Sequence, residues 1–162
     1  MKNYFFNILF LLGFFILPTH ATEKSKAADD VNLYIISPLD GETVSNPVKI
    51  VFGLKGMGVA PARIKFNNTG HHHLLIDVAD LPDVNSPIPS DDNHRHFGKG
   101  QTEALIELEP GEHTLQLMLG DHLHIPHDPV VFSKKIKISV KGKEMPPQEE
   151  KKCISNGYDG CK

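Results

Sequence analysis

Eight of the ten histidines in this chain fall in three short clusters. The clusters are His71-His72-His73, His94-Arg95-His96 and the segment from His122 to His127. The neutral imidazole side chain is the commonest metal ligand in proteins, and its charge changes near physiological pH. The clusters therefore predict a metal site, and no other feature of the sequence indicates chemistry as clearly.

The first cluster leads into an apolar run, so we expect it to open a β-strand. Strand alternation would place His72 on one face with Leu74 and Ile76, and His71 and His73 together on the other face. An i, i+2 pair of imidazoles is close enough to hold one ion. The alternative is a polar strand entry whose imidazoles bond to backbone groups or water.

The other two clusters lie in predicted loops, where the alternative is a set of solvated side chains. The loop from His122 to His127 contains Pro126, which stiffens it. A longer polar stretch, residues 81–100, carries the second cluster. Strand ends and loops gather at one end of a sandwich. We therefore hypothesise that one ion is held by one or more members of each cluster, taken from His71, His72, His73, His96, His124 and His127.

The donor types favour copper or zinc, held or delivered without catalysis, because imidazole suits both metals. Hydrolytic zinc chemistry would need an open coordination position and a general base. Glu103 or Asp121 could serve as that base, but no His-Glu-x-x-His motif is present. The sequence thus favours a protein without enzymatic activity. Met57 and Met118 could add thioether ligands for copper(I), although core packing explains Met118 better.

The remaining pattern is typical of an all-β protein. Short alternating or apolar runs are separated by Pro and Gly turns, and no window has a helical period longer than two turns. We predict a single domain over residues 31–140, an antiparallel β-sandwich. The expected strands are 33–37, 48–54, 71–78, 102–108, 113–119, 130–132 and 135–140. The residues expected to be buried are Ile106, Leu115, Leu117, Ile136 and Ile138.

The two ends of the chain predict export. Residues 1–21 have the charge, apolar run and small-residue ending of a secretory signal peptide. An uncleaved anchor, the alternative, would need about 20 apolar residues. We expect residues 22–30 to form a flexible leader and residues 141–162 a polar tail. In a periplasmic or secreted protein, Cys153 and Cys161 could close a local disulfide, and two free thiols are the alternative.

Charge and hydropathy restrict the expected partners. The net charge is −3 with both signs mixed along the chain, so no basic stripe predicts nucleic-acid binding. After the signal peptide, no segment is long and apolar enough to predict a membrane span. The expected partner is a metal ion. The alternative is a non-metal module that binds an envelope glycan or protein through hydrogen-bonding and stacking histidines.

Several segments also carry a family resemblance. They are residues 52–62, 69–77, 96–103, 110–117, 119–121 and 124–127. Together these segments resemble the bacterial exported family called domain of unknown function 4399, over residues 33–140. The resemblance implies an immunoglobulin-like β protein with one domain. It also implies that His71, His72, His73, His96, His124 and His127 belong to the family pattern. It implies no particular activity, because none is established for the family.

Overall fold

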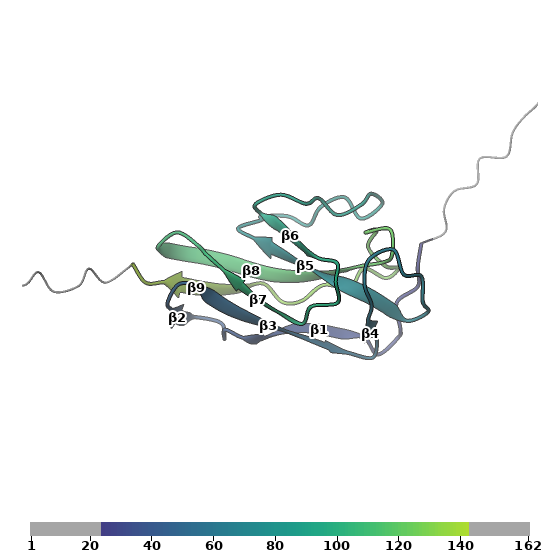
Figure 1. Cartoon of the computed structure of the whole chain (residues 1–162), viewed down its shortest axis with the longest axis horizontal. Coiled ribbons are helices and arrows are strands. Elements are labelled where there is room, and N and C mark those ends of the chain that lie inside the picture. The colour runs from purple at the N-terminus through teal and green to yellow at the C-terminus, as the bar shows by residue number, and fades with distance from the viewer. Residues whose placement is uncertain (1–23, 143–162) are drawn as a thin grey trace, which may run out of the picture.

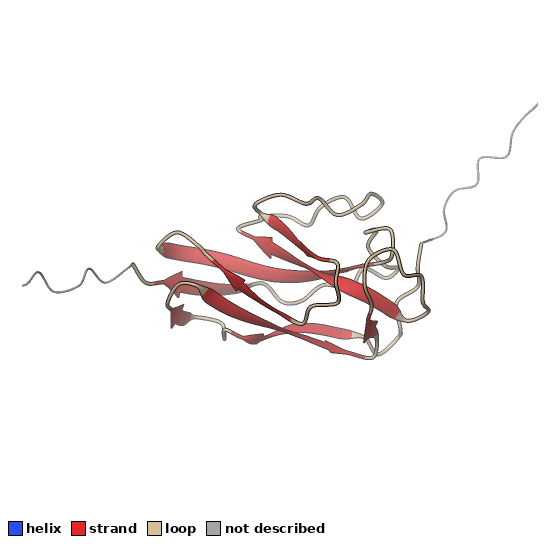
Figure 2. Cartoon of the chain, in the orientation of Figure 1, coloured by secondary structure: helices blue, strands red, loops and turns tan. Residues whose placement is uncertain are grey.

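The computed structural model describes residues 24–142, and all regular elements within that range are β-strands (Figure 2). No helix in this range is long and apolar enough to cross a membrane. The all-β prediction is confirmed. The strands are β1 (Asn32–Ser37), β2 (Glu42–Val44), β3 (Val48–Lys55), β4 (Gly58–Val59), β5 (Thr69–Ile76), β6 (His94–Phe97), β7 (Glu103–Ile106), β8 (Gly111–Gly120) and β9 (Ile136–Val140).

The strands form two sheets (Figure 1). The smaller sheet has the order β1-β3-β7, and both of its pairs are antiparallel. The larger sheet has the order β2-β9-β8-β5-β4, and β6 pairs with β5 on the same side as β4. Most pairs are antiparallel as expected, but β2–β9 and β4–β5 are parallel, so the larger sheet is mixed. The finer immunoglobulin-like description stays a prediction.

The main hydrophobic core contains side chains from both sheets. Leu33, Ile50 and Phe52 from the smaller sheet are buried together with Leu74 and Leu117 from the larger one. This is the burial that alternation predicts, because every second residue of a strand faces the same side. Three of the residues predicted to be buried, Leu115, Leu117 and Ile138, are at most 1% exposed. The other two, Ile106 and Ile136, are half-buried.

β5 is buried on both of its faces, from Gly70 to Ile76. On the face away from the main core, Leu75 packs with Met118 and Ile88 in a second apolar cluster. Ile88 belongs to the stretch 81–100, which we expected to be a polar loop. That stretch instead covers β5, and it contains the short strand β6. Met118 is a packing residue, as expected, and is fully buried.

Part of the predicted leader, residues 22–30, lies within the described range. Ala27 N–H donates to the Asp128 carbonyl and Asp128 N–H donates to the Ser25 carbonyl, both at 3.0 Å. The Ser25 hydroxyl also donates to Asp121 Oδ2 at 2.8 Å. Residues 25–27 therefore lie against the loop that follows β8. The predicted signal peptide, Cys153 and Cys161 lie outside the described residues.

The end of β5 is tied to the start of β8 by Asp77, and this pair gives a pH-dependent prediction. Asp77 Oδ2 lies 2.7 Å from His113 Nδ1, and Asp77 Oδ1 accepts the Thr114 N–H at 2.7 Å. Burial lowers the pKa of His113, but the bonds to Asp77 and to the Glu109 carbonyl outweigh it, so the pKa is raised above 6.5. Protonated His113 therefore stabilises the folded chain fully below pH 6.5. This stabilisation is lost as the pH rises through the pKa of His113 in the folded chain.

We expect His113→Gln to reduce the free energy of unfolding by about 1 kcal/mol or less near pH 6, because the pair is partly exposed. Near pH 9 the reduction should be smaller. Urea unfolding at the two pH values measures this difference. An equal reduction at both values would show that the charge on His113 is irrelevant to stability.

Candidate metal centre

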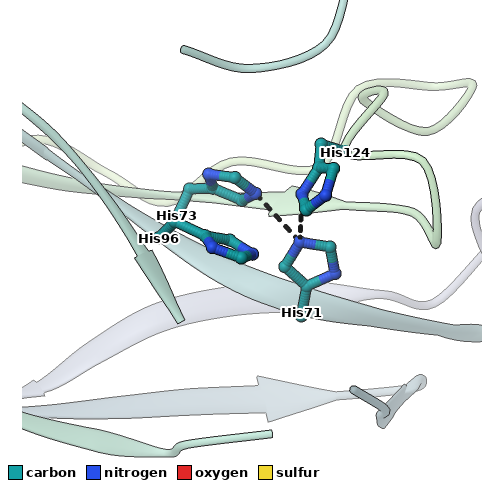
Figure 3. Close-up of side chains that lie close together, drawn as sticks. All are labelled: His71, His73, His96 and His124. Carbon is teal, nitrogen blue, oxygen red and sulfur yellow. Dashed lines mark hydrogen bonds between the residues drawn. The ribbon is translucent and has the colours of Figure 1, made fainter. Parts of the chain in front are cut away.

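Four imidazoles converge on the outer face of the larger sheet (Figure 3). His71 and His73 come from β5, His96 comes from β6, and His124 comes from the loop after β8. One ring nitrogen of each side chain lies within 4.8 Å of one from every other. The structure therefore brings together at least one member of each sequence cluster.

Strand register explains the positions of three of these side chains. His73 is the direct partner of His96 in the antiparallel β5–β6 ladder, and directly paired residues present their side chains on the same face. His71 is two residues before His73, so it shares that face as well. Its partner on β8 is Gly120, which has no side chain to occupy the face. The pairing of β5 between β6 and β8 thus creates the site.

A turn after β8 places the fourth imidazole. His124 has a φ of 66°, in the left-handed region that residues other than glycine rarely adopt. The Asp121 carboxylate holds this turn by accepting the N–H groups of Leu123 at 2.8 Å and Ile125 at 3.0 Å. The His124 carbonyl also accepts the Ile88 N–H at 2.8 Å. The backbone of the turn is therefore fixed on both sides.

The charge of Asp121 is maintained by its hydrogen bonds. Burial raises the pKa of its carboxyl group. The hydrogen bonds from the Ser25 hydroxyl and from the N–H groups of Leu123 and Ile125 lower the pKa by a larger amount. The net pKa lies below the ordinary value. An ionised Asp121 is a stronger acceptor for the turn that carries His124.

One ring nitrogen, His71 Nε2, is shared between two hydrogen-bond contacts. His71 Nε2 lies 3.1 Å from His73 Nε2 and 3.1 Å from His124 Nδ1 (Figure 3). A neutral ring nitrogen has either one N–H or one lone pair in the ring plane, so His71 Nε2 cannot make both bonds well. A tetrahedral zinc ion at about 2.1 Å from each nitrogen would separate them by about 3.4 Å.

Burial keeps the two deepest imidazoles of this cluster, His71 and His73, neutral. His71 and His73 are each 1% exposed. Burial, followed by repulsion from the neighbouring imidazoles, lowers the pKa of His71 to about 3 and that of His73 to about 2. The same two causes lower the pKa of His96. Metal binding requires neutral imidazole, so at neutral pH these ligands need not lose a proton first.

The two remaining histidines of the cluster border the solvent. His96 is exposed and His124 is half-buried, so an ion would enter between them. His73 Nδ1 is buried without a hydrogen-bond partner among the described residues. Ligating histidines ordinarily donate their second N–H to an acceptor. The site therefore lacks this support at His73, and the unpaired nitrogen costs the folded chain about 1–3 kcal/mol.

Two glycines provide the space for the ligands. A Cβ atom on Gly98 would lie 2.3 Å from His96 Cε1, and one on Gly120 would lie 2.9 Å from His73 Nε2. Both distances are shorter than any normal carbon contact. Neither glycine has a positive φ. Glycine is needed at these two positions because there is no room for a side chain, and not because the backbone conformation is unusual.

We expect Gly98→Ala to weaken metal binding by about tenfold or more, which corresponds to about 1.4 kcal/mol. The new methyl group would push the exposed His96 ring out of the cluster and leave the core intact. Calorimetric titration measures the affinity, and thermal unfolding tests the fold. Gly142→Ala is the matched control, because nothing lies within 4 Å of its added Cβ atom. Unchanged affinity in Gly98→Ala would show that His96 is not a ligand.

The structure does not bring His72 and His127 to this cluster, although we predicted both as ligands. Alternation turns His72 into the main core, where its ring centroid lies 5.0 Å from that of Phe52. Its Nδ1 lies 3.1 Å from the Gln101 carbonyl. His127 is also buried, with Nε2 at 3.1 Å from the Thr69 carbonyl. Strand alternation already separates His72 from His71 and His73, but nothing in the sequence distinguishes His127 from a ligand.

The other residues that we considered lie elsewhere. Glu103 forms an ion pair with Lys49 on the smaller sheet, at 3.1 Å. Asp121 accepts hydrogen bonds from Ser25 and from two N–H groups of its own turn. His94 bonds to Asp91 at 2.9 Å, outside the cluster. Met57 packs against the main core.

The fold and this site define an all-β protein with four clustered histidines that could hold a metal ion. Residues 50–141 match the family described as domain of unknown function (DUF4399), and the chain belongs to that family. The matched residues include the whole histidine cluster. The predicted family resemblance is therefore confirmed. No curated protein matches the chain significantly.

Proposed function

We propose that this protein binds one copper(II) or zinc(II) ion through His71, His73, His96 and His124, and that it holds or delivers the ion without catalysis. The observation that supports the proposal is the convergence of four imidazoles from three segments that are distant in sequence. Two of the four rings, His71 and His73, are each 1% exposed, and His71 Nε2 is shared between two contacts that it cannot both satisfy well. A cation accepting all four lone pairs would satisfy the ring nitrogens.

The donor set supports these two metals. Hard ions such as calcium and magnesium prefer oxygen ligands, and the candidate cluster contains only histidine nitrogens. Imidazole suits zinc and copper. Four protein ligands complete a tetrahedral zinc site and leave no position for a reacting water, which favours holding over hydrolysis. The exposed His96 provides a side from which an acceptor could take the ion.

We place this function outside the cytoplasm, in the periplasm or the medium, because residues 1–21 have the pattern of a secretory signal peptide. N-terminal sequencing of the protein recovered from a periplasmic fraction is the test. A mature protein starting after Ala21 supports export, and recovery of the uncleaved chain in the cytoplasm contradicts it.

Calorimetric titration of the protein without residues 1–21 tests the metal proposal. We expect one site per chain for zinc(II) or copper(II), and an affinity loss of about a hundredfold or more in His124→Ala. The matched control is His122→Ala, two residues away in the same loop. His94→Ala is the corresponding control for His96→Ala on β6. Both controls should retain the wild-type affinity.

The proposal fails if the wild-type protein binds neither metal more tightly than free histidine does. It also fails if His122→Ala and His124→Ala weaken binding equally. Either result would favour a module whose histidines bind an envelope glycan or protein.

A further inference from the structure

A pocket of about 350 Å³ lies beside the histidine cluster and is separate from it. Its walls come from residues 24–26, from residues 64–69 before and at the start of β5, and from the loop after β8. None of the four clustered histidines lines it. The volume lies at the lower end of the range for small-molecule sites, about 300–1,000 Å³.

The pocket has an excess of positive charge. Lys24, Lys26 and Lys65 line it, and none of them takes part in an ion pair within residues 24–142. Asp121 is its one lining carboxylate among the described residues. The oxygens of Asp121 already accept hydrogen bonds from Ser25 and from two N–H groups of its own turn. The ammonium groups are therefore left available to a ligand.

The rest of the wall supplies both polar and apolar contacts. The side chains of Asn67 and Asn68 line the pocket and are exposed. Phe66 and Ile64 also line it, and they are 72% and 56% exposed. Exposed apolar side chains at the mouth of a charged pocket favour a ligand with a carbon skeleton over a bare inorganic ion.

We propose that this pocket binds a small organic anion that carries two or more carboxylate or phosphate groups. Several ammonium groups around one pocket attract a multiply charged ligand more strongly than a singly charged one. The amide side chains add hydrogen bonds, and Phe66 and Ile64 cover the carbon skeleton. The inference does not rest on the metal proposal, because the two sites share no lining residue.

The test is an NMR titration of the metal-free protein with citrate, which carries three carboxylates, and separately with fructose 1,6-bisphosphate, which carries two phosphates. Citrate chelates metals, so the titration is repeated in the His96→Ala, His124→Ala double variant, which excludes binding through an ion. We expect saturable shifts at one site, centred on the amides of residues 24–26 and 64–69. Response to citrate alone assigns a polycarboxylate ligand, and response to fructose 1,6-bisphosphate alone assigns a ligand with several phosphates.

A charge-matched pair of variants tests the role of the lysines. The triple variant Lys24→Gln, Lys26→Gln, Lys65→Gln should weaken binding by about tenfold or more, since charge-assisted hydrogen bonds are lost. The control variant Lys55→Gln, Lys99→Gln, Lys134→Gln removes the same charge from exposed positions outside the pocket. It should change the affinity by less than about twofold.

Two outcomes overturn the proposal. The first is the absence of saturable shifts in the wild-type protein with either probe. The second is equal weakening in both triple variants, which would show that only the overall charge attracts the anions. Because the wild-type shift map needs no substitution, the proposal remains testable even if the first triple variant does not fold.

Discussion

Zinc(II) at about a thousand times its dissociation constant is expected to raise the free energy of unfolding by about 4 kcal/mol. The reason is that the ligands come from β5, β6 and the loop after β8, so unfolding separates them. An ion that binds the folded chain and not the unfolded chain shifts the equilibrium by mass action. Urea unfolding with and without zinc measures the increment.

His73→Gln should reduce that increment to less than about 1 kcal/mol at the same zinc concentration, because a buried ligand is lost. His122→Gln is the control and should retain the full increment. The two variants contain the same number of histidines. Any weak binding of zinc to the unfolded chain is therefore the same in both. Equal increments in the two variants would remove His73 from the ligand set.

Acid is expected to destabilise the metal-free protein well before its carboxylates are protonated. The pKa values of His71 and His73 are about 3 and about 2 in the folded chain, against 6.5 when unfolded. Groups whose pKa is lowered on folding give stability that is complete above the unfolded value and falls below it, until the folded pKa is reached. For two such histidines the loss between pH 6.5 and about pH 5 is about 3 kcal/mol. Urea unfolding across this range measures it.

The double variant His71→Gln, His73→Gln should lose the part of this pH dependence that comes from these two side chains, because glutamine does not titrate, while the buried His72, whose pKa burial also lowers, keeps its own contribution. His113→Gln provides a control of opposite sign. The pKa of His113 is raised by its bonds to Asp77 and Glu109 against the lowering effect of burial, so its stabilisation disappears at high pH and not at low pH. A steep loss of stability below pH 6.5 that persists in the double variant would place its origin elsewhere.

Much of this structure could be predicted from periodicity. Alternation of apolar residues identified the long strands β3 and β8, because burial of one strand face leaves a period of two in the sequence, and a continuous apolar run identified β5, which is buried on both faces. Alternation also separated His72 from His71 and His73. The same reasoning missed β6, since His94–Phe97 has no apolar alternation. Its position depends on pairing with β5, which is a tertiary contact.

The ligand set could be predicted less well, for physical reasons. His124 and His127 lie in one loop and differ only in their surroundings. His124 points to the cluster because Asp121 fixes a left-handed turn, whereas the His127 ring faces the Thr69 carbonyl and is buried. Gly98 and Gly120 were not considered as site residues. Glycine close to a histidine cluster was the one available signal, because it marks space for a neighbouring ring.

The position of β6 also has a kinetic consequence. β6 has four residues and hydrogen-bonds to β5 alone among the described strands, and of these four residues only Phe97 is buried in the main core, so we expect its local opening to require less free energy than global unfolding. Opening of this strand would remove His96 and leave the buried pair on β5 in place. The lifetime of a bound ion would then depend on fraying of one short edge strand, and its affinity on all four nitrogens. Substitutions that strengthen the β5–β6 pairing would slow exchange with little change in the stability of the rest of the sheet.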